Sequence, residues 1–317
     1  MTKLVRELLP FGSLLLIICV LSAWQPDSFL TLDNFLNVFR RSSVYGIIAV
    51  GMTFIIISGG IDLSVGSLLA LAGMIAAQTM IAIGGADPTG TSLLVGTAVG
   101  LAVGALCGMI NGVVLTRLKL QPFIVTLGTM SLFRGIALVM NDGQPLNVPS
   151  YRFLAEGTLV GVPVSVLIFL AIIALAAAAL RYTRFGRHTY AIGSNREAAY
   201  HAGVNVARTQ LGIYALGGLL TGLAAMIAAS RTVSAQPTAG VGAELDVIAA
   251  VVIGGASLSG GRGTIIGTVV GTLLISFLRN GCTLVGISTN AQLIVIGVVI
   301  IIAVAVDQFT REKAAGS

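Results

Sequence analysis

Charged residues are scarce in this chain of 317 residues: Asp, Glu, Lys and Arg together make up 9% of it, whereas apolar residues make up 56%. Soluble domains carry about 25% charged residues, so the chain lacks the polar surface that a large water-soluble globule needs. The abundance of apolar residues also excludes an intrinsically disordered chain. With a mean hydropathy of +0.99, the composition predicts an all-α polytopic membrane protein.

Reactive side chains are few as well, with 2 histidines and 3 cysteines. The cysteines form no C-x-x-C pair, and neither an H-E-x-x-H helix nor a G-x-x-x-x-G-K-[ST] phosphate loop is present. We therefore expect no catalysis, no metal or cofactor site and no ATP hydrolysis in this chain. The net charge of +6 comes from short basic segments between apolar runs, which is typical of membrane topology and not of nucleic-acid binding.

Long apolar runs are abundant, and a spanning helix needs about 20 such residues. The long runs are Leu8–Trp24, Ser92–Leu115, Phe123–Met140, Leu159–Leu180, Gln210–Ala229, Thr264–Leu278 and Ala291–Val306. Two more regions are interrupted. Val44–Ile83 is broken at residues 58–62, and Leu245–Ala256 is too short to span alone. Splitting the first of these regions gives about ten spans in a single transmembrane domain, residues 1–317.

Basic residues predict the orientation of these spans. Lys3 and Arg6 precede the first run, which we interpret as an uncleaved span that starts in the cytoplasm. Ten spans then place both termini and most basic residues on the cytoplasmic side. Arg40 and Arg41 do not fit this pattern: if residues 32–41 form an interfacial helix, the chain has eight or nine spans. The hydrophilic stretch 181–208 is expected to be a cytoplasmic loop of helical character.

A faint duplication relates two parts of the chain. The similar segments are Gly96–Gly100 with Gly267–Gly271, Asn111-Gly112 with Asn280-Gly281, and Ile61–Leu63 with Leu245–Val247. In the ten-span arrangement the repeats cover residues 43–140 and 209–306, and an offset of five spans inverts one repeat relative to the other. Inverted repeats with interrupted helices are common in transporters. Chance similarity between Gly- and Val-rich segments is the alternative.

Acidic residues stand inside the two interrupted regions. An ionised Asp at a helix centre costs roughly 2.5–3.5 kcal/mol on insertion scales, so Asp62 and Asp246 need a local role. We favour N-caps at helix starts, with lining of a polar path or ion coupling as the alternatives. The irregular segment 234–240 adds neutral groups that suit a polyol. The residues that we name for this path and its helix breaks are Gly59, Gly60, Asp62, Ser64, Gln236, Thr238, Glu244 and Asp246.

Two further features concern packing between spans. Gly96, Gly100, Gly104, Gly108 and Gly112 recur at every fourth position, and such a smooth stripe favours static close packing of helices over a sliding surface. An arginine within a span, as at Arg134, should either be paired or extend its charged end to the membrane interface. We expect a structural ion pair with another span there.

Four motifs in the same order resemble the ribose-type permease subunit of bacterial ABC sugar importers. They are Ala49–Thr53 followed by Ser58–Ser67, Thr183–Arg187 continuing through Tyr190–Ala199, Ser234–Gly240, and Glu244–Gly255. The resemblance covers nearly the whole chain and is weakest in the first 40 residues.

The resemblance implies a homodimer of permease subunits in the bacterial inner membrane. Separate ABC ATPase subunits would bind Mg-ATP, and a periplasmic or lipid-anchored sugar-binding protein would deliver the sugar. The family's cytoplasmic coupling segment corresponds to Arg184–Gly203. The residues that we expect to contact the ATPase are Arg184, Arg187, Asn195, Arg196, Glu197 and Ala198.

The leading hypothesis is therefore a non-catalytic transmembrane subunit that imports a monosaccharide, with ribose as the first expectation and other pentoses or hexoses left open. The main alternative is a secondary transporter driven by an ion gradient, with Asp62 or Asp246 as its coupling carboxylate. A non-transporting membrane scaffold is a third and weaker alternative.

Overall fold

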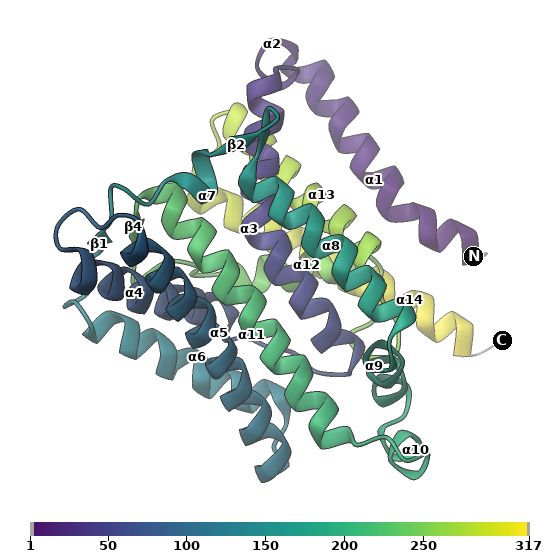
Figure 1. Cartoon of the computed structure of the whole chain (residues 1–317). Coiled ribbons are helices and arrows are strands. Elements are labelled where there is room, and N and C mark those ends of the chain that lie inside the picture. The colour runs from purple at the N-terminus through teal and green to yellow at the C-terminus, as the bar shows by residue number, and fades with distance from the viewer. Residues whose placement is uncertain (1–2, 316–317) are drawn as a thin grey trace.

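Helices make up most of the structure, which is a computed structural model that describes residues 3–315 (Figure 1). The long helices are α1 (Lys3–Trp24), α3 (Leu32–Ile57), α4 (Val65–Gly84), α5 (Thr91–Leu118), α6 (Pro122–Val139), α8 (Val164–Tyr182), α11 (Val206–Thr232), α13 (Ile265–Leu284) and α14 (Thr289–Ala315). The short helices are α2 (Pro26–Phe29), α7 (Phe153–Glu156), α9 (Arg184–Ser194), α10 (Arg196–His201) and α12 (Ala243–Ile253).

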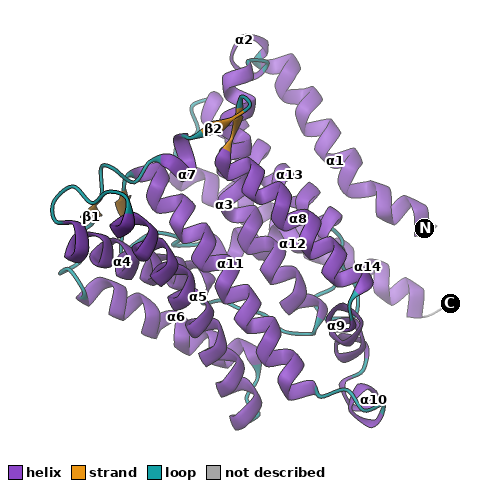
Figure 2. Cartoon of the chain, in the orientation of Figure 1, coloured by secondary structure: helices purple, strands orange, loops and turns teal. Residues whose placement is uncertain are grey.

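Four two-residue strands complete the structure: β1 (Leu146–Asn147), β2 (Thr158–Leu159), β3 (Val162–Pro163) and β4 (Ser234–Ala235). Strand β1 pairs with β4 and β2 pairs with β3, both antiparallel. These strands are small features of a helical bundle (Figure 2). Within the described residues, seven helices are long and apolar enough to cross a membrane: α3, α4, α5, α6, α8, α11 and α13. The prediction of an all-α polytopic membrane protein is confirmed.

Helix α3 is continuous over 26 residues, about 39 Å at 1.5 Å per residue. It begins after Thr31, whose side chain accepts a hydrogen bond from the backbone N–H of Asn34. No breaker follows until Gly59, which has a φ of +80°. Arg40 and Arg41 therefore lie within this long helix, and the separate interfacial helix considered for residues 32–41 is not formed.

The core lies around α3, α4 and α11. In the most apolar stretches of α3 and α4, 83% and 67% of the residues are buried, against 28% in α6 and 22% in α8. Helices α3 and α11 pack against each other and run in opposite directions, because α3 starts beside α2 and α11 starts beside α10 (Figure 1). The inner helices are therefore surrounded by protein, while α6 and α8 expose apolar side chains such as Val139 and Leu175.

The glycine stripe of α5 packs against α11 over most of its length, and Gly96 at its start faces Ala76 and Met80 of α4. A Cβ atom at Gly104 would lie 2.7 Å from the Cα of Gly222, and one at Gly108 would lie 3.0 Å from the Cα of Gly218. Membrane helices approach this closely only where small residues face each other. The stripe is thus a packing surface between two spans, as the sequence indicates.

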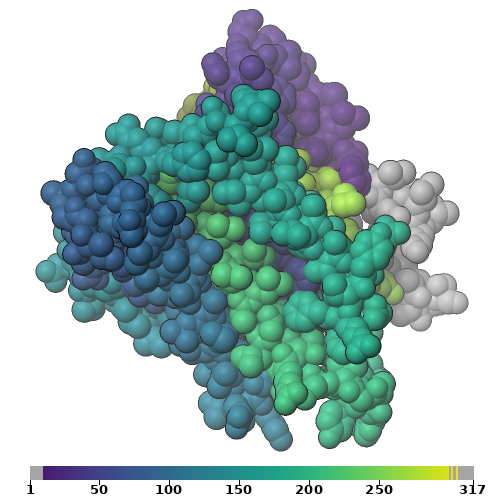
Figure 3. Space-filling view, viewed as in Figure 1, coloured from purple at the N-terminus to yellow at the C-terminus, as the bar shows by residue number. Residues whose placement is uncertain are grey.

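The two ends of the bundle differ in character. One end carries α2, α7 and the paired strands, and the opposite end carries α9 and α10 (Figure 1). In the space-filling view the segment around α10 projects from the rest of the molecule (Figure 3). The prediction of helical character for the stretch 181–208 is confirmed by α9 and α10.

Candidate functional site

The first interruption, between α3 and α4, is built around Asp62, whose side chain is buried with 1% exposure. Its Oδ1 accepts hydrogen bonds from the backbone N–H of Ser64 at 2.8 Å and from the Ser64 hydroxyl at 2.6 Å. Ser64 itself is the N-cap of α4, so the prediction that Asp62 is the N-cap is wrong by two positions. The carboxylate still satisfies a free backbone N–H group where the chain enters the helix, which is the physical need that the prediction identified.

Asn111 of α5 closes this polar cluster from the side. Its amide nitrogen donates to the Ser64 hydroxyl at 2.9 Å and to Asp62 Oδ2 at 3.4 Å. None of these partners is a cation. The Asn111 Oδ1 is buried and has no hydrogen-bond partner among the described residues. The interruption is therefore held by neutral hydrogen-bond donors, and the buried glycine at position 60 and the exposed Gly59 allow the chain to turn beside it.

At the second interruption, between α11 and α12, the buried carboxylate is paired with a cation and not with neutral donors. Asp246 is buried and its Oδ2 accepts a hydrogen bond from the guanidinium of Arg279 in α13 at 2.6 Å. The N-cap of α12 is Gly242, with a φ of +79°. The prediction that Asp246 caps this helix is therefore wrong, because Asp246 is the fourth residue of the helix and three helical residues separate it from the cap. Glu244 lies half-buried against α4: a Cβ atom at Gly66 would come within 2.7 Å of its Oε2.

Arg134 of α6 holds the segment that precedes α12. Its guanidinium donates hydrogen bonds to the carbonyl oxygens of Pro237 at 2.6 Å and Ala239 at 2.9 Å. The expected contact ion pair with another span does not form at Arg134, since irregular backbone supplies carbonyl oxygens that accept from the guanidinium. The Glu244 carboxylate of α12 is near enough to interact with this charge electrostatically. The other side of this segment is held by β1, which pairs with β4. Gln236 and Thr238 remain exposed between these two attachments.

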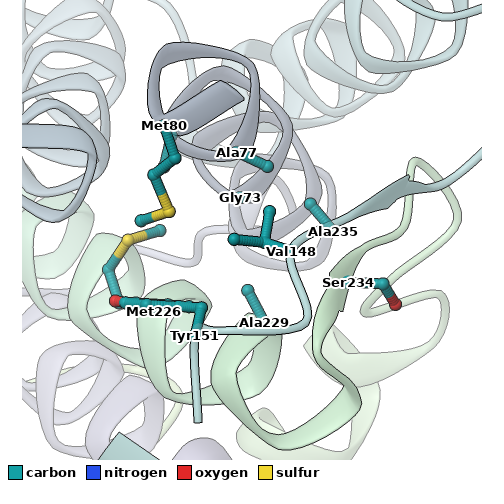
Figure 4. A pocket seen from close by; sticks show the side chains of 10 residues that line it. Gly73, Ala77, Met80, Val148, Tyr151, Met226, Ala229, Ser234 and Ala235 are labelled. Carbon is teal, nitrogen blue, oxygen red and sulfur yellow. The ribbon is translucent and has the colours of Figure 1, made fainter. Parts of the chain in front are cut away.

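A small cavity of about 70 Å³ adjoins the same segment. Its polar lining comes from Thr232, Ser234 and Gln236, and the rest is mostly alanine from α11, from α4 and from the segment itself. Figure 4 shows the neighbouring pocket, where the side chains of Met80 and Met226 face each other. The sequence identified the polar residues here but not the alanine lining, because alanine is equally common at tightly packed helix contacts.

We expect Arg134→Met to loosen this segment. Hydrogen bonds to a charged group contribute about 1.5–3 kcal/mol each, and methionine removes both of those that reach Pro237 and Ala239. The thiol of Gln236→Cys should then react with a water-soluble maleimide several times faster than the same thiol does when Arg134 is present. Arg117→Met, at an exposed position at the end of α5, is the control. Equal reaction rates in both variants would contradict the attachment.

The opposite end of the molecule presents the residues named for coupling. All six are exposed: Arg184, Arg187, Asn195, Arg196, Glu197 and Ala198. Their geometry comes from two side-chain caps. Thr183 accepts from the N–H of Gly186 to begin α9, and Asn195 accepts from the N–H of Ala198 at 2.9 Å to begin α10. Asn195 is thus a structural cap as well as a surface residue, and the turn that it stabilises presents Arg196 and Glu197 to solvent.

Comparisons with known proteins agree with this arrangement. Residues 34–304 match the family described as branched-chain amino acid transport system / permease component. The ribose import permease protein RbsC of Bacillus subtilis (strain 168) is 45% identical over 314 residues, which are 98% of this chain and 94% of that protein. Its counterpart in Escherichia coli (strain K12) is 44% identical over 93% of this chain and 91% of its own length.

The D-allose transport system permease protein AlsC of Escherichia coli (strain K12) is 38% identical over 94% of this chain and 90% of its own length. No solved structure matches the chain. The resemblance to ribose-type permeases is confirmed, because family and relatives extend over nearly all of the residues that form the bundle and both interruptions. The chain therefore belongs to the ribose-type ABC permease family, as a multi-pass, non-catalytic membrane subunit of a sugar importer.

Proposed function

We propose that this permease imports ribose across the bacterial inner membrane. The observation that carries this proposal is the 45% identity to a ribose import permease over 98% of the chain. Identity to the D-allose permease and to the L-arabinose permease AraH of Escherichia coli (strain K12) is lower, at 38% in each case. The exposed neutral groups of Gln236 and Thr238 support the passage of an uncharged polyol, which needs weak hydrogen bonds and no counter-charge.

The transporter that we propose contains two copies of this chain, two ABC ATPase subunits and a sugar-binding protein. The chain itself holds no cofactor, and Mg-ATP binds to the ATPase partners. The sugar path runs between the two copies along the interrupted segments 58–64 and 233–242. The exposed turn between α9 and α10 meets the ATPase, so that closure of the ATPase subunits on ATP moves this turn and changes which side of the path is open.

The topology that we propose has ten crossings, with both termini on the side of α9 and α10. The inverted repeat of residues 43–140 and 209–306 is supported by matching helix neighbours. In this repeat α3, α4, α5 and α6 correspond to α11, α12, α13 and α14. The contact of α5 with α11 then matches that of α13 with α3, and the contact of α4 with α6 matches that of α12 with α14. The opposite directions of α3 and α11 (Figure 1) are those that an inverted repeat requires.

Transport in proteoliposomes tests the proposed function. We expect ribose uptake only when the ATPase, the binding protein and ATP are all present, and we expect collapse of the proton and sodium gradients to leave uptake unchanged. Competition by unlabelled allose and arabinose measures the sugar preference. Uptake by this chain alone, driven by an ion gradient, would instead support the secondary transporter with Asp62 or Asp246 as its coupling group.

A charge reversal at Glu197 tests the coupling surface. Like charges placed together at an interface cost several kcal/mol, so we expect Glu197→Arg to lower ATP-driven ribose uptake about tenfold or more. Glu156→Arg, which reverses another exposed carboxylate at the opposite end of the bundle, should leave ATPase-dependent uptake near the parent level. A scaffold without transport activity predicts that Glu197→Arg alters assembly alone.

A further inference from the structure

Three segments that are distant in the sequence meet at one point beneath the core. They are the last turn of α3, the last turn of α9 and the loop of residues 254–264 between α12 and α13. The carbonyl oxygen of Ile57 accepts a hydrogen bond from the N–H of Gly261 at 2.8 Å. The hydroxyl of Tyr190 in α9 donates to the carbonyl oxygen of Gly263 at 2.7 Å. We call this meeting point the α9 junction, formed by Ile57, Tyr190, Gly193 and residues 260–263.

The backbones at the α9 junction touch without intervening side chains. A Cβ atom at Gly193 would collide with the carbonyl oxygen of Ile57 and would lie 2.6 Å from the nitrogen of Gly261. A Cβ atom at Gly260 would lie 2.7 Å from the carbonyl oxygen of Gly193 and 3.1 Å from the Cα of Gly59. Backbone atoms cannot move aside as the end of a flexible side chain can. Helix α9 therefore has little freedom to shift relative to α3 and the loop 254–264.

The position of the α9 junction links one helix to both interruptions. Ile57 is the last residue of α3, directly before the break that contains Asp62. The loop 254–264 continues from α12, whose other end follows the exposed segment of Gln236 and Thr238. Close-packed protein contacts transmit displacement and do not absorb it. A shift of α9 therefore moves the ends of α3 and α12 together.

Two further contacts keep α9 aligned at this point. The ring of Phe185 packs against that of Phe54 in α3, with centroids 5.8 Å apart. Burial raises the pKa of the Tyr190 hydroxyl above its ordinary value of 10.0, so the group stays protonated and donates to Gly263 at neutral pH. The helix is thus held at its first turn by an aromatic contact and at its last turns by the α9 junction.

We propose that Gly193 and Tyr190 are positioning residues for transport: they make the α9 junction stiff, so that movement of α9 reaches both interruptions of the sugar path. We expect neither residue to contact the sugar or ATP. The inference rests on the proposed contact between the ATPase and the turn that joins α9 to α10. It assigns the transmission of movement to specific backbone contacts behind that surface.

The experiment compares the number of ribose molecules imported per ATP hydrolysed in the complete transporter in proteoliposomes. We expect Gly193→Ala to lower this ratio about tenfold, since a methyl group forced into a backbone contact pushes the segments apart. Tyr190→Phe removes only the hydroxyl and should lower the ratio about threefold to tenfold. Gly128→Ala in α6, where nothing lies within 4 Å of the added Cβ atom, and Tyr182→Phe at the exposed end of α8 are the controls.

The outcomes separate this inference from the proposed function. Arg196→Cys is introduced into the parent protein and into each variant and is cross-linked to the ATPase. Absence of any cross-link in the otherwise unchanged protein would overturn the proposed coupling surface itself. With cross-linking intact, a ratio unchanged in both Gly193→Ala and Tyr190→Phe would overturn the role of the α9 junction alone. If Gly193→Ala does not fold, Tyr190→Phe decides. A merely structural role would lower the yield of protein without changing the ratio in the assembled complex.

Discussion

Replacement of Gly108 by valine is expected to prevent the folded protein from accumulating. Gly108 faces α11 across a close helix contact in the bundle core, where a Cβ atom would collide with the carbonyl oxygen of Tyr214 and lie 3.0 Å from the Cα of Gly218. Overpacking in a core costs about 1–3 kcal/mol when side chains can adjust, and here the obstacles are backbone atoms on a neighbouring helix. The loss should reach or exceed the upper value, against a total stability of about 5–15 kcal/mol.

Size-exclusion chromatography after detergent extraction, together with a thermal unfolding curve, measures this effect. Gly135→Val is the matched control, because Gly135 is also a glycine inside a membrane helix, but with no atom within 4 Å of an added Cβ. The two substitutions make the same change to helix propensity, so any difference between them reports the contact with α11. A monodisperse Gly108→Val protein with the melting temperature of Gly135→Val would show that α5 and α11 separate at low cost.

The ion pair between Asp246 and Arg279 should produce the second large effect. The carboxylate and guanidinium are 2.6 Å apart, with side-chain exposures of 9% and 26%. Removal of one partner leaves a buried charge without compensation, which typically costs 3–5 kcal/mol. We therefore expect Arg279→Met to destabilise the protein by about this amount, because methionine fills much of the same volume but leaves Asp246 unpaired.

The double variant Asp246→Leu/Arg279→Met distinguishes the loss of a pair from the loss of packing. An apolar replacement of both partners is often neutral or stabilising, so the double variant should recover most of the stability lost in Arg279→Met. A double-mutant cycle on the unfolding free energy measures the coupling between the two residues. Arg187→Met on exposed α9 is the control for removing an arginine. A cost below about 1 kcal/mol for Arg279→Met would indicate that water solvates the pair like a surface ion pair.

Several elements were predictable from local sequence because their causes are local. The glycines and Asp62 at positions 58–62 predict a break in an apolar region, and α3 does end at Ile57 while α4 begins at Val65. The polar stretch 181–208 predicts a helical loop outside the membrane, and it forms α9 and α10. In both places the composition of a few adjacent residues decides whether the backbone continues as an apolar helix.

The side-chain partners inside the bundle were not predictable in the same way. Arg134 was expected to pair with an acid, but its hydrogen bonds go to the carbonyl oxygens of Pro237 and Ala239, which lie 103 and 105 positions further along the chain. Asp246 was expected to cap its own helix, but it pairs with an arginine 33 positions away. A charge in an apolar chain shows that a partner is required, whereas several polar groups on other helices could meet that requirement.

The amino-acid sequence by itself thus determined that this is a helical membrane protein, where its apolar helices are interrupted and which family it resembles. Each of these follows from composition or from motifs read along the chain. Only the tertiary structure decided which backbone atoms Arg134 holds, that Arg279 neutralises Asp246, and that Gly193 contacts the end of α3. Those contacts depend on how helices far apart in the sequence approach one another, and that approach is the result of packing the whole bundle at once.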